Sequence, residues 1–300
     1  MDIYTQAESN TRKTWFYLFF FLLLIIAVGW VISYFFESPI ILYAAVAFSF
    51  ILNFFAYWFS DKVILGLSGA KLIEKKDNPE LYRLVENLCI TAGLPLPKIY
   101  IISSSQPNAF ATGRDAKHAV VAVTSGLLEK LERVELEGVI AHELSHIGNK
   151  DMLLQTIVVV LVGFIVILTD FFFRLAFFGN IGRNNREGGQ VKLVMMIVAM
   201  ILVVLAPLLA QLIKLAISRK REYLADASAV LLTRYPEGLA RALEKIQADP
   251  GVLNKANNAT SHLYIVNPLK GKEGKSWLSK LFSTHPPLEE RIKKLRNINI

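Results

Sequence analysis

Residues 141–146 read Ala-His-Glu-Leu-Ser-His, the one place in the chain where two histidines bracket a carboxylate. On an α-helix, His142 and His146 lie one turn apart, so both imidazoles project from the same face. Two imidazoles in that relation bind one Zn²⁺ from one side, and Glu143 is then placed to reach a water on the metal. The pattern predicts a helix that carries two zinc ligands and the general base of a zinc peptidase.

The residues before this motif predict the same helix, because residues 133–140 carry apolar side chains at helical spacing. Given the His and Glu content of the chain, the HExxH pattern is expected by chance in well under about 1% of such sequences. Zinc binding is therefore favoured over coincidence, provided that the chain supplies a third ligand.

The best candidate for the third ligand is Glu222. In the metzincin pattern a further histidine follows the second one, but residues 147–152 read Ile-Gly-Asn-Lys-Asp-Met. The other subclass takes a glutamate from a separate helix, which gives an open His₂Glu site. Most single glutamates on helices are solvated charges. Glu222, however, lies just after an apolar run and among Arg and Lys residues, and this position favours a role as metal ligand. Asp226, four residues later, can accept the free N–H of a ligand histidine.

The composition is that of a membrane-embedded protein. The 300 residues are 53% hydrophobic and 11% aromatic, with a mean hydropathy of +0.41. The net charge of +8 does not indicate a nucleic-acid partner, because no basic module interleaved with aromatic residues is present. The single cysteine, Cys89, excludes an internal disulfide and is expected to be a buried structural thiol.

Two apolar runs near the N-terminus predict a membrane hairpin. Residues 15–36 and 39–59 are uncharged and about long enough to cross a bilayer, and a signal-peptide cleavage site is missing. Positive residues flank the outer ends of the pair and are absent from the turn at Glu37-Ser38. Both ends are therefore expected on the cytoplasmic side. Residues 1–59 form a first unit: a polar N-terminal segment and this hairpin.

A second pair of apolar runs, at 152–173 and 191–218, forms the unit 152–218. Ionisable side chains near the ends of these runs can snorkel to the interface. The loop between the runs carries arginines, which disfavours an extracytoplasmic position. It is therefore open whether this pair crosses the membrane or only enters it.

Residues 60–151, the unit that holds the HExxH motif, predict mixed α and β structure. A helix is expected at 79–92, with strands at 98–102 and 119–124. Between the strands, Asn108-Ala109-Phe110-Ala111 predicts an edge strand, to which an extended substrate can add through its main chain. A small sheet without any role in substrate binding is an equally open alternative.

The last unit, residues 219–300, contains a predicted helix at 236–248 and a short strand at 263–266. Near its end, Thr284-His285-Pro286-Pro287 places a histidine before a helix that begins with proline.

These motifs, in this order, resemble the HtpX-type membrane zinc metallopeptidases, bacterial relatives of the CAAX prenyl proteases. The resemblance covers nearly the whole chain. The segments that carry it are an apolar hairpin, Asn-Ala-Phe-Ala-Thr-Gly at 108–113, His-Glu-Leu-Ser-His at 142–146, Arg-Glu-Tyr-Leu-Ala-Asp at 221–226 and Thr-His-Pro-Pro at 284–287. The polar segment before Trp15 is longer than that family leads one to expect, and its role is open.

The resemblance implies a mainly α, multi-span membrane protein with a zincin-like α+β peptidase domain that carries a small sheet. It also implies ATP-independent cleavage of unfolded or damaged membrane proteins in stress-linked quality control. The protein would lie in the bacterial inner membrane, with its catalytic domain in the cytoplasm and the bilayer and its substrates as partners.

By the same resemblance, the chain holds one Zn²⁺ through His142, His146 and Glu222, with Glu143 as base. Asp226 orients a ligand histidine. His285 reaches the site from the C-terminal segment, where a cationic imidazole can donate to the tetrahedral oxyanion, and Arg291 is its partner charge. Tyr264 and His262 are rivals for the donor role.

The same residues leave two alternatives to the function of a quality-control protease. A processing protease for lipidated or membrane-anchored peptides would share the metal chemistry and differ only in its cavity. A membrane scaffold or transporter with structural zinc is disfavoured, because structural sites are usually closed by four protein ligands, often cysteines, and Cys89 is the sole cysteine.

Overall fold

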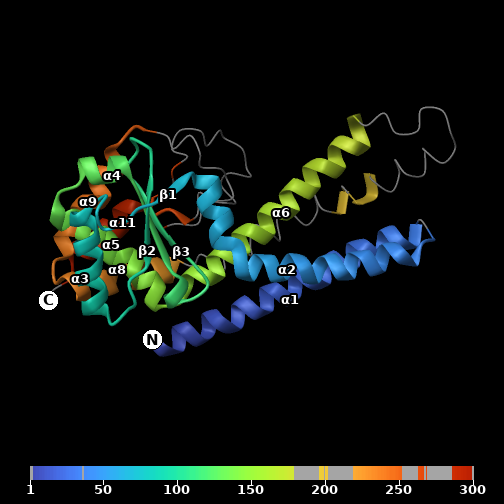
Figure 1. The fold of residues 1–300 in the computed structure, drawn as a ribbon, viewed down its shortest axis with the longest axis horizontal. Helices are drawn as coiled ribbons and strands as arrows, with labels where there is room; N and C mark the ends of the chain where they lie inside the picture. Colours follow the sequence, from blue (N-terminus) through green and yellow to red (C-terminus); the bar gives the residue numbers. More distant parts are fainter. Residues whose placement is uncertain are drawn as a thin grey trace.

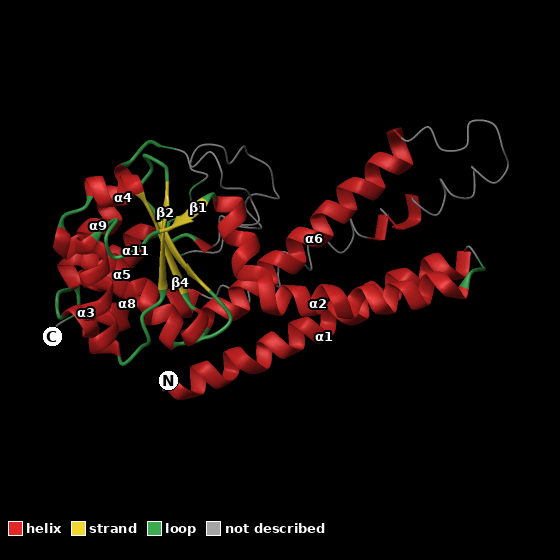
Figure 2. Cartoon of the chain, in the orientation of Figure 1, coloured by secondary structure: helices red, strands yellow, loops and turns green. Residues whose placement is uncertain are grey.

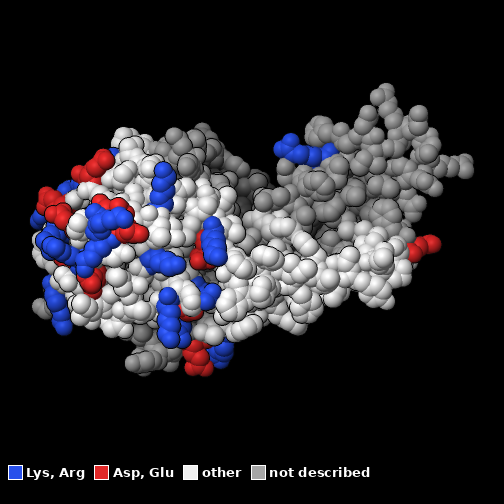
Figure 3. Space-filling view, in the orientation of Figure 1, with Lys and Arg blue, Asp and Glu red and all other residues white. Residues whose placement is uncertain are grey.

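The computed structural model describes residues 3–35, 37–178, 196–198, 200–201, 219–251, 263–266, 268 and 286–298. An arm of long helices extends from a unit in which helices surround a small sheet (Figures 1 and 2). Charged side chains gather on this unit, whereas the arm presents an almost uncharged surface (Figure 3). The described part of the chain is thus mainly helical and combines membrane and water-exposed surfaces.

Helices α1 (Ile3–Phe35) and α2 (Pro39–Ser68) form the predicted hairpin and lie side by side in the arm. At their turn the Ser33 hydroxyl donates to the Ser38 carbonyl oxygen at 2.8 Å, and α2 starts with proline at its first turn. By length and composition, Glu8–Tyr34 and α2 are the two described helices able to span a membrane, each by itself. Residues 3–14 of the polar N-terminal segment form the first part of α1.

The third apolar run forms α6 (Asp151–Phe178). It follows α5 (Arg133–Gly148) after a bend of 84°, and α5 together with residues Asp151–Ile165 of α6 is long and apolar enough to span a membrane. The fourth run, 191–218, lies almost wholly outside the described residues. Within the described ranges there are therefore two candidate spans, or three if the bent pair counts as one.

The described strands form one mixed sheet in the order β1-β2-β4-β3. Strand β2 (Lys98–Ile102) runs parallel to β4 (Val120–Thr124), and both outer pairings, with β1 (Ala70–Leu72) and β3 (Ala109–Thr112), are antiparallel. The expected strands at 98–102 and 119–124 are confirmed to within one residue, and β3 lies at the edge of the sheet as predicted. Strand β1 was not predicted, because three residues carry too little alternation to be recognised.

The remaining helices are α3 (Pro79–Ala92), α4 (Ser125–Lys130), α8 (Arg219–Thr233), α9 (Pro236–Ala248) and α11 (Leu288–Arg296), with a 3₁₀ turn at Ala116–His118. The predicted helices at 79–92 and 236–248 are confirmed. The expected strand at Leu263–Val266 is wrong: these residues form turns. Their one backbone hydrogen bond to the sheet edge runs from Ile265 N–H to the Ala109 carbonyl oxygen at 3.0 Å.

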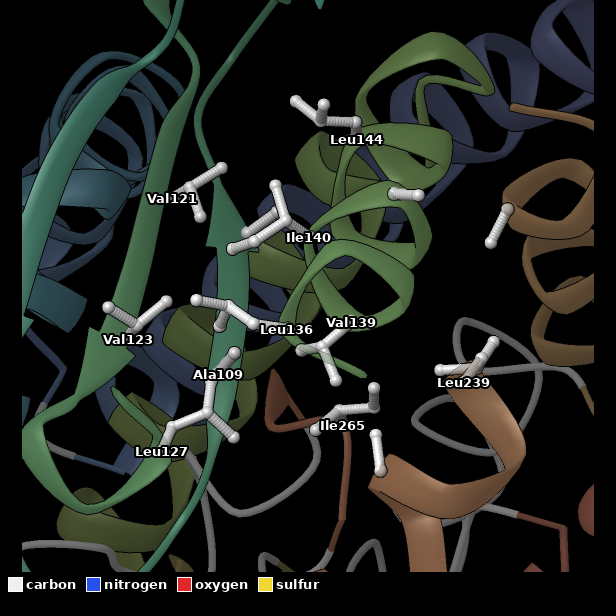
Figure 4. Close-up of a cluster of buried hydrophobic side chains, with 14 of the residues drawn as sticks. Ala109, Val121, Val123, Leu127, Leu136, Val139, Ile140, Leu144, Leu239 and Ile265 are labelled. Carbon is white, nitrogen blue, oxygen red and sulfur yellow. The ribbon is translucent and has the colours of Figure 1, made fainter. Parts of the chain in front are cut away.

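Helix α5 lies between the sheet and helices α8 and α9. Its Ile140 and Leu144 side chains point toward the sheet, on the side where Val121 of β4 lies, whereas Val139 points toward Ile265 (Figure 4). The helices approach closely at two glycines. A Cβ on Gly138 would lie 2.7 Å from the Leu239 backbone nitrogen, and one on Gly238 would lie 2.6 Å from the Val134 carbonyl oxygen. This packing holds the HExxH helix rigidly in the core.

Cys89 is buried in the same core, on α3. Burial raises the pKa of its thiol to about 11, which leaves it protonated at neutral pH. The expectation of a buried structural thiol is confirmed.

Candidate metal centre

Helices α5 and α8 bring together the residues that the sequence predicted as metal ligands. The Nε2 atoms of His142 and His146 lie 3.2 Å apart. The Glu222 carboxylate approaches them at 3.9 Å for His142 and 3.7 Å for His146. One ligand atom from each residue fits within 4.8 Å of the other two, and all three side chains are buried.

Each histidine has a carboxylate at its other ring nitrogen. Asp226 Oδ1 lies 3.0 Å from His142 Nδ1, and Asp151 Oδ2 lies 3.1 Å from His146 Nδ1. Asp226 was expected in this place, but Asp151 was not, because from the sequence it was assigned only as the last residue of the unit 60–151. A usable signal was present: an acid that directly precedes a long apolar helix, five residues after a ligand histidine, is costly to bury without a partner.

Arg291, on α11, closes the site from a third side and is fully buried. Its guanidinium donates to both oxygens of Asp226 at 2.9 and 2.7 Å, and its Nη1 lies 3.5 Å from Glu222. Nη1 also donates to the Ile265 carbonyl oxygen at 3.1 Å. The side chain thereby neutralises carboxylates that would be expensive to bury alone.

Glu143 is buried beside the two histidines. Burial raises the pKa of its carboxyl to about 7, although the cationic His146 imidazole and a hydrogen bond from the Ala111 backbone N–H act in the opposite direction. Its Oε1 atom has no hydrogen-bond partner among the described residues. A buried acid of this kind is suited to accept and return a proton near neutral pH.

The two histidines differ in protonation. Burial lowers the pKa of His142. Burial also acts to lower the pKa of His146, but Asp151 and Glu222 outweigh it and raise that pKa to about 9. His146 therefore carries a proton in the metal-free protein, which a bound cation must displace.

The donor set fits a divalent metal such as zinc. Two imidazole nitrogens and one carboxylate converge, each histidine is oriented by a carboxylate, and three protein ligands leave a position open. Metal binding would also give the two Nε2 atoms, which lie 3.2 Å apart, a common partner.

The predicted substrate segment lies next to this centre. Asn108 is buried, and its side chain donates to the Val266 carbonyl oxygen at 2.8 Å. The Asn108 carbonyl oxygen accepts from Thr124 N–H of β4, so the main-chain groups of Ala109 and Ala111 point away from β4, toward the free edge. The N–H of Ala111 reaches Glu143, which places this end of β3 against the metal centre.

The remaining candidates fall elsewhere. His285 and its rival His262 lie outside the described residues. Tyr264 is buried against Phe110, with the two ring centroids 5.1 Å apart. It packs in an apolar cluster with Ile64 and Leu65 of α2, on the face of β3 opposite to the Ala109 and Ala111 side chains.

Comparison with known proteins identifies the family. Residues 75–299 match the model of peptidase family M48. A protease HtpX homolog of Dictyoglomus thermophilum is 48% identical over 294 residues, covering 98% of this chain and 94% of that protein. A protease HtpX homolog of Thermococcus kodakarensis is 45% identical over 269 residues, which cover 89% of this chain and 90% of that protein. Ste24p of S. mikatae shares the fold with a TM-score of 0.54 at 23% identity, over 94% of this chain and 66% of that one. The chain therefore belongs to peptidase family M48, among the HtpX-type membrane metalloproteases that its motifs resemble.

Proposed function

We propose that the chain is a zinc-dependent membrane endopeptidase in which His142, His146 and Glu222 bind one Zn²⁺ and Glu143 is the general base. The observation that carries this proposal is the convergence of three donors from two helices within 4.8 Å of one another, beside a buried carboxylate oxygen that lacks a partner among the described residues. Residues 60–151 and 219–300 together build this peptidase unit, because α5 packs on both α8 and α9. Residues 1–59 and 152–218 form its membrane parts.

When bound, zinc supplies Lewis-acid polarisation of the scissile carbonyl and lowers the pKa of a coordinated water to about 7. The protein residues prepare the ligands for it. Asp226 and Asp151 accept the Nδ1–H of His142 and His146, which leaves each Nε2 lone pair free to bind the metal. Arg291 holds Asp226 with two hydrogen bonds and so keeps this orientation.

Glu143 moves the proton. In its ionised form the carboxylate takes a proton from the attacking water and then returns it to the leaving amine of the cleaved peptide bond. A pKa near 7 suits both transfers at neutral pH. The Ala111 N–H holds the carboxylate in place, and the cationic His285 is proposed to donate to the oxyanion of the tetrahedral intermediate.

We propose that an extended substrate pairs with β3 through Asn108-Ala109-Phe110-Ala111. The hydrogen bond from the Ile265 N–H to the Ala109 carbonyl oxygen supports this proposal, because it joins a second backbone to this edge. Both outward groups of Ala109 are already bonded, the N–H to the Asn108 side chain and the carbonyl oxygen to the Ile265 N–H, and the Ala111 N–H reaches Glu143. Pairing with a substrate would therefore use the Ala111 carbonyl oxygen, adjacent to Glu143, where a scissile bond must lie to be cleaved.

We further propose that the substrates are unfolded or damaged membrane proteins and that the site lies on the cytoplasmic face of a bacterial inner membrane. Support comes from the distribution of charge. Lys and Arg gather on the peptidase unit, whereas the turn between α1 and α2 carries no positive residue.

Cysteine labelling tests this orientation. In a Cys89→Ala background, Ser38→Cys is expected to react with a membrane-impermeant maleimide in intact cells, because Ser38 lies at the outer turn of the hairpin. Ser103→Cys, exposed on the peptidase unit, should react only after permeabilisation. Labelling of Ser103→Cys but not Ser38→Cys in intact cells would contradict this orientation and indicate the opposite topology.

The activity itself is tested with the purified full-length protein in detergent. Cleavage of an unfolded membrane protein is expected, with loss after chelation and recovery on adding Zn²⁺, because the open His₂Glu site requires the metal. The folded form of the same substrate is the control and should resist cleavage. If only short lipidated peptides are cut and unfolded proteins remain intact, the substrate proposal fails in favour of a processing protease.

A further inference from the structure

The N-terminal polar segment reaches the metal centre through Asn10. This side chain lies on α1, five residues before the uncharged run, and is completely buried. Its Nδ2 donates to Asp151 Oδ1 at 2.6 Å and to the Asn149 carbonyl oxygen at 3.1 Å, while its Oδ1 accepts from Arg221 Nη1 at 2.9 Å. Both amide hydrogens and the amide oxygen of Asn10 are thus used within the protein.

The other oxygen of Asp151 contacts His146. Oδ2 lies 3.1 Å from His146 Nδ1, on the side of the imidazole opposite to its metal-facing Nε2. Arg221, which precedes Glu222, has its Nε 3.7 Å from Asp151 Oδ1, beyond hydrogen-bond distance. Asn10 bridges the two, since it accepts from Arg221 and donates to Asp151.

The two histidines are therefore supported in parallel ways. Behind His142, Asp226 is held directly by two hydrogen bonds from Arg291. On the Nδ1 side of His146, the Asp151 carboxylate lies near the buried Arg221 guanidinium, which is too far away to donate a hydrogen bond to it. Asn10 supplies the hydrogen bond that fixes this carboxylate. Without a donor at Oδ1, the Asp151 carboxylate would lose the contact that sets its rotation about χ2.

We propose that Asn10 is a positioning residue for the metal centre: it orients Asp151 and, through it, the imidazole of His146, and it couples the first membrane helix to the site. This inference rests on the proposed role of His146 as a metal ligand. Burying an amide next to an apolar span is costly unless it is hydrogen-bonded, and the partners that satisfy Asn10 include the carboxylate that contacts His146.

The decisive variant is Asn10→Asp. It keeps the size of the side chain and the acceptor toward Arg221, but it replaces both N–H donors with an oxygen facing the Asp151 carboxylate. Loss of a direct outer partner of a metal ligand, here Asp151, typically costs about 10–100-fold in metal affinity. Because Asn10 acts through Asp151, we expect zinc affinity to fall by at most about that factor, measured on the full-length protein by competition with a chromophoric chelator. The visible spectrum of the Co²⁺-loaded protein should change with it.

Thr14→Val is the matched control. Thr14 is buried one turn further along α1, and its hydroxyl donates only to the Asn10 backbone carbonyl. This variant loses a buried hydrogen bond of the same helix without touching Asp151, so its zinc affinity and Co²⁺ spectrum should equal those of the wild type. Thermal unfolding of the metal-free forms reports any general destabilisation separately.

A double-mutant cycle with Asp151→Asn completes the test. If Asn10 acts through Asp151, the effect of Asn10→Asp on zinc affinity should largely disappear in the Asp151→Asn background. Equal affinity in Asn10→Asp and wild type, or the same loss in both backgrounds, would overturn the proposal. Failure of the wild type to bind zinc at all would instead refute the proposed metal site, so the two failures are distinguishable.

Discussion

Glu143→Gln is expected to abolish proteolysis while the purified protein keeps about one zinc per chain. The amide has the size of the carboxylate and still offers an oxygen to the Ala111 N–H, so the fold and the three ligands are undisturbed. It cannot accept the proton of the attacking water. General-base catalysis contributes about 10²–10⁴-fold, and cleavage of an unfolded substrate should fall by at least that factor. Cleavage rate and zinc content are measured on the same preparation.

The matched control is Glu137→Gln, which makes the same chemical change on the same helix at a residue that is half-buried and outside the metal centre. It should retain both zinc and activity. Loss of zinc from Glu143→Gln would mean that this carboxylate binds the metal and that its assignment as the base is incorrect.

Glu222→Gln is expected to lose both zinc and activity. The carboxylate is the sole anionic donor in the group of three and faces two imidazoles that are held by their own acids. Replacing it with an amide removes the negative charge from the ligand set and leaves Arg291, 3.5 Å away, with one anionic neighbour fewer. Metal analysis after dialysis against a fixed zinc concentration, together with the cleavage assay, measures both effects.

Three further variants test whether Glu222, and not a histidine, is the third metal ligand. Asp226→Asn should fall between wild type and Glu222→Gln, with zinc affinity lower by about 10–100-fold, since it removes an outer partner of His142. His262→Ala should keep zinc, and His285→Ala should keep zinc but lower turnover by about 10²–10³-fold, as expected for an oxyanion donor. Full zinc occupancy in Glu222→Gln, combined with loss in either histidine variant, would transfer the third ligand to that histidine.

Much of this protein follows from local sequence. The i, i+4 spacing of His142 and His146 requires one helical face, and α5 provides it. Helix α3 is capped at its start by Asn78, whose side chain accepts from the Leu81 N–H, and at its end by Gly93 in a left-handed conformation. The apolar runs specify the membrane hairpin by length alone. In each case the deciding interaction is between residues a few positions apart.

Only the tertiary structure decided how the centre is supported. Asp151, Arg221 and Asn10 belong to three helices, and the hydrogen bonds of Asn10 span 141 residues to Asp151 and 211 residues to Arg221. Residues 263–266 read Leu-Tyr-Ile-Val, a short apolar run that predicted a strand, but they form a 3₁₀ turn and bends, with one backbone hydrogen bond to β3. Periodicity reports which face of an element is apolar, whereas the partner of a buried polar group is chosen by the packing of whole helices against one another.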